Sequence, residues 1–107
     1  MWMRSLVLMS VLLSAQNLSA KAWLIDVRTA AEFSSAHVPG ATNIEYQQIV
    51  PAVIKLGISK QEPIQLYCRS GRRAEIARQA LLRQGYQSVI NLGSVASAQA
   101  HVQEPTP

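Results

Sequence analysis

An arginine-rich loop around the only cysteine constrains the fold more than any other segment of this 107-residue chain. The apolar run Ile64-Gln65-Leu66-Tyr67 leads into Cys68-Arg69-Ser70-Gly71-Arg72-Arg73, and a helix-like stretch from Arg73 to Gln84 leads out. A strand, a tight loop and a helix in direct succession form half of a βαβ unit. We therefore expect Cys68 at the carboxyl end of a strand and the amino end of a helix, where backbone N–H groups lack partners and the helix dipole is positive.

Those surroundings favour the thiolate form of Cys68 over the thiol. Arg69, Arg72 and Arg73 add positive charge and can bind an anion, and Gly71 allows the loop to curve tightly. The loop thus predicts a nucleophilic thiolate that meets a small anionic substrate. The alternatives are that Cys68 is an inert core thiol and that Arg72 and Arg73 are solvated residues of a first helical turn.

Short apolar runs alternate with helical segments along the rest of the chain. This order predicts an α/β fold with a mostly parallel central sheet of about four to five short strands, flanked by helices on both faces, and with the working residues at the carboxyl ends of the strands. The expected strands are residues 23–27, 42–44, 64–67 and 89–92. The expected helical segments are residues 30–35, which follow a capping box of Thr29 and Glu32, 46–56 in two pieces or beginning anew at Pro51, 73–84 and 95–103.

The N-terminal segment has a different composition. Arg4 precedes a largely apolar stretch, residues 5–15, and small residues follow it. This order is typical of a secretory signal peptide, and the apolar stretch is shorter than the about 20 residues that a membrane span needs. We expect a signal peptide over residues 1–20, cleaved after Ala20 or after Ala22, a domain over 21–103 and a frayed tail over 104–107. The expected location is the periplasm, with no stable membrane association after cleavage; an uncleaved anchor or a buried first helix is the alternative.

Composition limits the remaining possibilities. Apolar residues make up 49% and charged residues 15% of the chain, as in a compact globular domain. The net charge of +4 is concentrated near the cysteine loop, where few aromatic residues stand, so we expect a small anionic ligand and no nucleic acid. One cysteine permits no internal disulfide, and the two histidines lie far from it in sequence, so we expect no metal site and no cofactor.

Three motifs together resemble a rhodanese domain over residues 23–94. The first is Leu24-Ile25-Asp26-Val27-Arg28 with Glu32-Phe33, the second is His37 to Ile44, and the third is the C-x-x-G-x-R loop, Tyr67 to Ala74. The small size and the signal-like segment make the chain most similar to the exported, single-domain rhodaneses of the bacterial phage-shock type. One departure is Gly93-Ser94, where the family often has two glycines.

The resemblance implies a sulfurtransferase. Cys68 would attack the outer sulfur of thiosulfate, release sulfite and hold a persulfide, which cyanide or a thiol then removes. The substrate-binding loop would consist of Arg69, Ser70, Gly71, Arg72 and Arg73. Separately from the resemblance, we expect the mature protein to be a monomer.

Other functions remain open at this point. A cysteine phosphatase or arsenate reductase typically has a C-x5-R loop, and that arginine position is Ala74 here. A rhodanese-type module that binds or carries sulfur without catalysis is a second alternative. A thiol–disulfide oxidoreductase would require a C-x-x-C pair, and this chain has one cysteine. We expect structural roles for Asp26 and Arg28, as an ion pair that includes Glu32, and for His37, and no role for His101.

Overall fold

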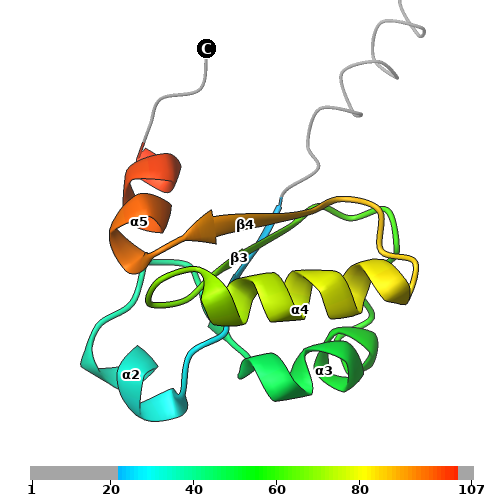
Figure 1. Ribbon diagram of the computed structural model, residues 1–107, viewed down its shortest axis with the longest axis horizontal. Coiled ribbons are helices and arrows are strands. Elements are labelled where there is room, and N and C mark those ends of the chain that lie inside the picture. The colour runs from blue at the N-terminus through cyan, green and yellow to red at the C-terminus, as the bar shows by residue number, and fades with distance from the viewer. Residues whose placement is uncertain (1–21, 104–107) are drawn as a thin grey trace, which may run out of the picture.

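A four-stranded sheet forms the centre of the computed structural model, which describes residues 22–103 (Figure 1). The strands β1 (Trp23–Asp26), β2 (Thr42–Asn43), β3 (Ile64–Tyr67) and β4 (Val89–Gly93) lie in the order β2-β1-β3-β4. All neighbouring strands are parallel, so their carboxyl ends meet at one edge of the sheet. The predicted fold class is confirmed.

Helices connect the strands and cover both faces of the sheet. The helices are α2 (Ala30–Ser35), the 3₁₀ helix η1 (Tyr46–Gln48), α3 (Ile49–Lys55), α4 (Arg72–Arg83) and α5 (Val95–Gln103). Their bounds agree with the expected ones to within one or two residues. The segment after β2 changes from 3₁₀ to α geometry at Ile49, not at Pro51. Pro51 stands in the first turn of α3, where its missing N–H costs no helical bond.

The main core lies between the sheet and helices α3 and α4 (Figure 1). Ala74, Ala77 and Leu81 are spaced by three and four residues along α4, so they form one apolar stripe that faces the strands. The strands contribute Ile25, Ile64, Leu66 and Val89 to the same core. This packing fixes the first turn of α4 against the end of β3, where Cys68 lies.

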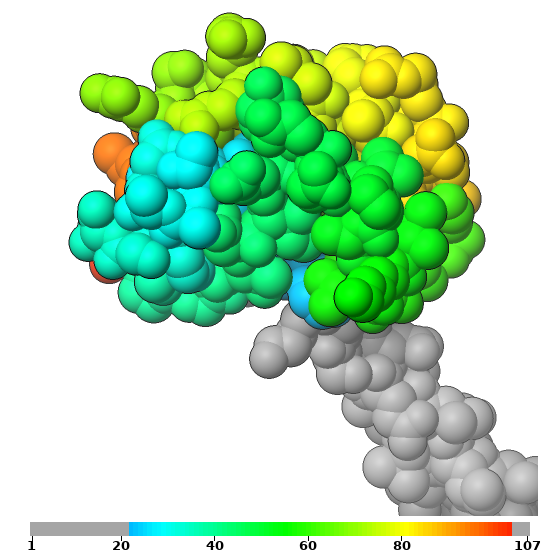
Figure 2. Space-filling model, turned by 90° about the horizontal axis from the view of Figure 1, so that it is seen from below, coloured from blue at the N-terminus to red at the C-terminus, as the bar shows by residue number. Residues whose placement is uncertain are grey.

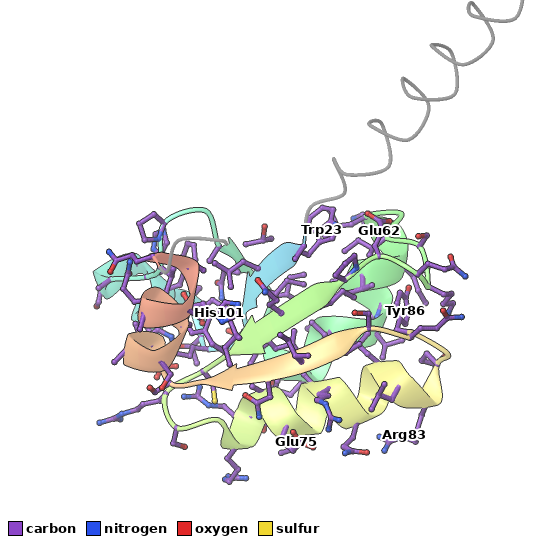
Figure 3. The ribbon with its side chains drawn as sticks, turned by 90° about the horizontal axis from the view of Figure 1, so that it is seen from above. Trp23, Glu62, Glu75, Arg83, Tyr86 and His101 are labelled. Carbon is purple, nitrogen blue, oxygen red and sulfur yellow. The ribbon has the colours of Figure 1, made fainter. Side chains whose placement is uncertain are left out.

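Helix α5 packs on the opposite face. Its Ala98 lies in a smaller core with Val38 and Tyr67, and Figure 3 shows the helix at the end of the sheet toward which β3 and β4 run. The short α2 buries none of its residues fully. It begins with the predicted capping box, since Thr29 Oγ1 accepts the Glu32 N–H at 3.2 Å and Glu32 Oε1 accepts the Thr29 N–H at 2.9 Å.

The signal peptide and the frayed tail expected from the sequence lie outside the described residues. Within residues 22–103, none of the helices has the length and apolar character that crossing a membrane requires.

Candidate active site

Cys68 directly follows β3, at the carboxyl edge of the sheet. The pairing of β3 with β4 shifts register just before it, because Leu66 pairs with Asn91 and Tyr67 with Gly93. The Cys68 backbone N–H then donates to the Gly93 carbonyl at 3.0 Å. Cys68 is therefore held by the last hydrogen bond of the sheet before the chain enters α4.

The surroundings of the Cys68 sulfur favour its ionised form. Burial raises the pKa of the thiol, and the backbone N–H groups of Ala74, Ser70, Gly71 and Arg73 lower it more, so that the net shift is downward. The Gly71 N–H lies 3.0 Å from Sγ. The residue is only 1% exposed. A buried cysteine whose sulfur accepts from several N–H donors differs from an inert core thiol, which needs no such donors.

Gly71 forms the turn that makes this array possible. It caps α4 with φ +95°, a left-handed conformation that side chains other than glycine rarely adopt. A Cβ at this position would lie 3.4 Å from the Gly93 Cα atom. The loop thus curls closely against the end of β4 and returns to the sulfur.

The three loop arginines lie in different environments. Arg73 donates through Nη1 and Nη2 to both carboxylate oxygens of Glu32, at 2.8 and 3.2 Å. Arg69 and Arg72 are exposed and form no ion pair within residues 22–103. Figure 2 shows the segment around residues 69–72, in lime, projecting from the surface beside α2 in cyan. Two of the three charges are thus available to a ligand, and the third is already paired.

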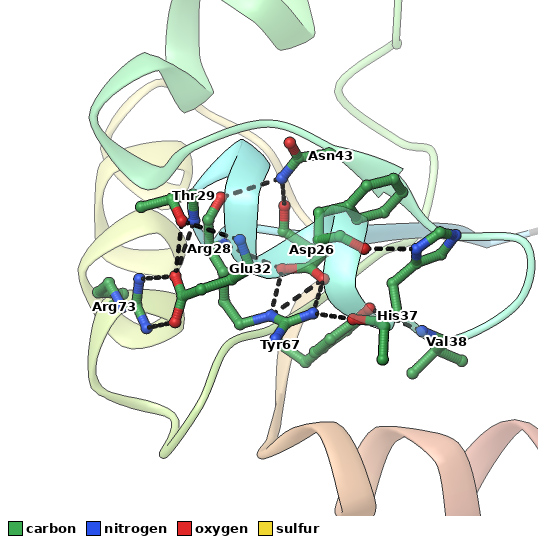
Figure 4. A network of polar contacts seen from close by, with 11 residues as sticks. Asp26, Arg28, Thr29, Glu32, His37, Val38, Asn43, Tyr67 and Arg73 are labelled. Carbon is green, nitrogen blue, oxygen red and sulfur yellow. Dashed lines mark hydrogen bonds and ion pairs between the residues drawn. The ribbon is translucent and has the colours of Figure 1, made fainter.

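A buried ion pair stands beside the loop (Figure 4). The fully buried Asp26 accepts from Arg28 Nη2 at 2.7 Å, from Arg28 Nε and from the Arg28 backbone N–H. Arg28 Nη2 also donates to the Ala36 carbonyl at 2.7 Å. The structural role expected for Asp26 and Arg28 agrees with these contacts. The expected inclusion of Glu32 in this pair is wrong, since Glu32 bonds to Arg73.

Tyr67 completes the same network. Its hydroxyl accepts the Val38 N–H at 3.0 Å, and its ring lies 5.8 Å from the Arg28 guanidinium carbon. Burial, together with the nearby Asp26, raises the pKa of Tyr67 to about 12. The residue is therefore a neutral, fixed support for the chain on which Cys68 lies.

The histidines take no part in this site. His37 Nδ1 lies 2.8 Å from the Phe33 carbonyl oxygen and the two rings stack, as expected of a structural residue. His101 Nε2 lies 3.1 Å from Gln65 Nε2 on the other face of the sheet. No cluster of three or more metal-ligating side chains is found among the described residues.

Residues 11–100 of this chain match the Rhodanese-like domain family. The chain belongs to this family. It is 28% identical to the thiosulfate sulfurtransferase PspE of Escherichia coli strain K12, over 89% of this chain and 90% of PspE. It is 33% identical to the putative sulfur carrier protein YrkF of Bacillus subtilis strain 168, over 64% of this chain and 36% of YrkF. A solved structure, a rhodanese with anions from E. coli, superposes with a TM-score of 0.66 at 29% identity, over 72% of this chain and 91% of that one.

The family match and these relatives make the chain a rhodanese-family sulfurtransferase. The predicted resemblance is confirmed, and the particular roles of Cys68 and of Arg69, Ser70, Gly71, Arg72 and Arg73 stay predictions. At the position where a phosphatase loop would carry its arginine, this rhodanese has Ala74, which is fully buried in α4.

Two residues near the carboxyl end of β4 have contacts that the sequence did not predict, and one of them, Asn91, contacts the rhodanese loop. Asn91, on β4, donates to the Gly71 carbonyl at 2.9 Å. The one indication of a special role in the sequence was the residue type, because asparagine is uncommon in strands. Ser94, noted only as a departure from two glycines, caps α5 by accepting the Ser97 N–H at 3.1 Å. The departure therefore supplies a helix cap directly after the strand that supports Cys68.

Proposed function

We propose that this protein transfers a sulfane sulfur from thiosulfate to cyanide or a thiol through a persulfide on Cys68. The Cys68 thiolate attacks the outer sulfur of thiosulfate, the S–S bond of the donor breaks, and sulfite leaves with the bonding electron pair. In the second half-reaction the acceptor attacks the outer sulfur of the persulfide, and the Cys68 thiolate leaves. Because the sulfur is held covalently between the two steps, the kinetics should be ping-pong.

The observation that carries this proposal is the array of backbone donors around a buried sulfur. Four N–H groups, those of Ser70, Gly71, Arg73 and Ala74, lower the pKa of Cys68, and donors at a helix amino terminus also stabilise bound anions. Cys68 is 1% exposed, so only a donor with a small reacting end can approach it. Thiosulfate presents a single terminal sulfur.

The charge of the loop supports a dianionic donor. Arg69 and Arg72 are exposed without an acidic partner in the described part of the chain, whereas the nearby Glu32 and Glu75 are paired with Arg73 and Arg78. The unpaired charge at the mouth of the site is therefore positive. An anion would offset the cost of holding two cations close together at a helix amino terminus.

Intact mass spectrometry tests the proposal. Wild-type protein incubated with thiosulfate should gain the mass of one sulfur atom, and cyanide should remove it with formation of thiocyanate. The Cys68→Ser variant should gain none. A wild-type protein that binds no sulfur from thiosulfate, or that hydrolyses an aryl phosphate instead, contradicts the proposal. A persulfide that forms but passes to neither cyanide nor a thiol would indicate a sulfur carrier and not an enzyme.

We also propose that the protein is exported to the periplasm. The support is the order of residues 1–20: a positive charge, an apolar stretch and small residues. Protein isolated from the cell envelope should begin near Lys21 or Trp23 by N-terminal sequencing. A chain that still begins at Met1 would contradict processing.

A further inference from the structure

Asn91 links the two ends of the cysteine loop. Its Nδ2 donates to the Gly71 carbonyl at 2.9 Å and to Glu75 Oε1 at 3.3 Å, and its Oδ1 accepts the Gly93 N–H at 2.8 Å. The Gly93 carbonyl in turn accepts the Cys68 N–H at 3.0 Å. One amide side chain therefore fixes the Gly71 end of the loop directly and the Cys68 end through a single intervening residue.

No other side chain from outside the loop hydrogen-bonds to the backbone of residues 68–73 within the part of the chain that the structure describes. The Gly71 carbonyl has one further donor, the Glu75 N–H at 2.9 Å, which is the first bond of α4. Among residues 22–103, the contact with Asn91 is thus the one hydrogen bond from a side chain of the sheet to the backbone of the loop.

The held carbonyl belongs to the least restricted residue of the loop. Gly71 has φ +95° and no Cβ, so few steric barriers oppose rotation of the peptide group that follows it. A carbonyl oxygen turned toward Sγ would place a negative partial charge where the N–H donors now point. Such a rotation would disfavour both the thiolate and a bound anion.

We propose that Asn91 is a positioning residue for sulfur transfer, whose amide holds the Gly71 carbonyl away from the Cys68 sulfur and keeps the loop N–H donors directed at that sulfur. This inference rests on the proposed function for its kinetic consequence, but its effect on the thiol can be measured without any sulfur donor. Asn91 itself does not touch the sulfur or the substrate.

The test uses Asn91→Leu, which keeps the approximate size of the side chain and removes its hydrogen bonds. The rate of alkylation of Cys68 by iodoacetamide, followed by intact mass as a function of pH, reports the pKa of the thiol. Loss of the neutral hydrogen bond to the Gly71 carbonyl, the one of the three that holds the loop directly, should raise this pKa by about half a unit to one unit and lower kcat for sulfur transfer by roughly three- to tenfold. The matched control is Ile90→Ala, on the neighbouring residue of β4, which is 44% exposed and should leave both quantities unchanged.

Two results would overturn the inference. One is an alkylation profile of folded Asn91→Leu that coincides with that of the wild type. The other is an equal shift in Ile90→Ala, which would show that loosening β4 in any way has the same effect.

A second variant covers the case in which Asn91→Leu does not fold. Asn91→Asp keeps the acceptor for the Gly93 N–H and loses the donor to the Gly71 carbonyl. Its thiol pKa should be raised in about 0.05 M and in about 1 M salt, because a lost hydrogen bond is not screened. A shift that disappears at high salt would come from the new charge alone and would contradict the positioning role.

The two proposals can fail separately. If wild-type protein forms no persulfide from thiosulfate but Asn91→Leu still shifts the alkylation profile, the proposed function fails and the positioning role stands. If the wild type forms the persulfide and Asn91→Leu has an unchanged profile, the reverse holds.

Discussion

Arg73, in the first turn of α4, and Glu32, in α2, form a two-bonded ion pair with distances of 2.8 and 3.2 Å, although 41 residues separate them in sequence. Glu32 also closes the capping box of α2 through Thr29. The same carboxylate therefore stabilises the start of one helix and attaches it to the start of another, beside Cys68.

Because Arg73 is paired with Glu32 and Arg72 is not, we expect substitutions of these two arginines to have different effects on stability. Arg72→Ala should raise KM for thiosulfate several-fold and leave the free energy of unfolding within about 0.5 kcal/mol of the wild-type value, because Arg72 is exposed. Arg73→Ala should lower the free energy of unfolding by up to about 1 kcal/mol, because it leaves Glu32 without its partner. Urea titrations and steady-state kinetics measure the two quantities. Equal losses of stability in both variants would contradict this division of roles.

The stability of the protein should depend on pH through Glu32. Arg73, and then Thr29, hold the pKa of Glu32 at about 2, against an ordinary value of 4.5. A carboxylate with a lowered folded-state pKa contributes its full stabilisation above the ordinary value and loses it as the pH falls through the folded value. Wild-type protein should therefore lose this contribution between about pH 4.5 and pH 2.

The variant Glu32→Gln serves as the comparison, measured by urea unfolding across the same pH range. Its deficit in unfolding free energy relative to the wild type should be constant above about pH 5 and should shrink toward pH 2, because the wild type loses its carboxylate there. A deficit that stays constant down to pH 2 would mean that the Arg73 contact does not lower the pKa of Glu32 in solution.

Gly71 and Gly57 provide a matched pair of substitutions. Both have positive φ, +95° and +74°, but a Cβ on Gly71 would lie 3.4 Å from the Gly93 Cα atom, and a Cβ on Gly57 would meet no atom within 4 Å. Gly71→Ala and Gly57→Ala should each cost about 1–2 kcal/mol of backbone strain. Only Gly71→Ala should also reduce persulfide formation from thiosulfate, measured by intact mass, because Gly71, unlike Gly57, donates its N–H to the Cys68 sulfur. Loss of persulfide in both variants would point to general destabilisation.

Ser94 should matter for stability and not for sulfur transfer. Ser94→Ala removes the side-chain acceptor of the Ser97 N–H at the start of α5 and should cost about 1 kcal/mol, whereas Ser94→Gly should cost a few tenths. Both variants should form the persulfide at the wild-type rate. A slower rate in Ser94→Gly would show that the hydroxyl acts on the sulfur site and not only on the helix.

Local signals predicted much of this fold. The Thr29–Glu32 capping box placed α2 to the residue, and the apolar run before Cys68 placed β3, because both depend on neighbours in sequence. The side-chain pairing could not be predicted in the same way. Glu32 was assigned to Arg28, four residues away, and not to Arg73, since the choice between two arginines depends on where α4 lies in space.

The same limit applies to Asn91. The sequence predicted a strand over residues 89–92, but the contact with Gly71 depends on the register shift that pairs Tyr67 with Gly93. No local sequence pattern encodes a register shift of one residue. The only indication around Asn91 was that asparagine is uncommon in strands.

The bond from the Cys68 N–H to the Gly93 carbonyl also has a consequence for biosynthesis. The cysteine is translated about two dozen residues before the strand that orients it, so a nascent chain that ends before residue 93 contains the loop N–H donors but lacks the acceptor of the Cys68 N–H. We therefore expect a chain that lacks β4 to hold Cys68 less firmly against its donors and to react more slowly with sulfur compounds than the full chain.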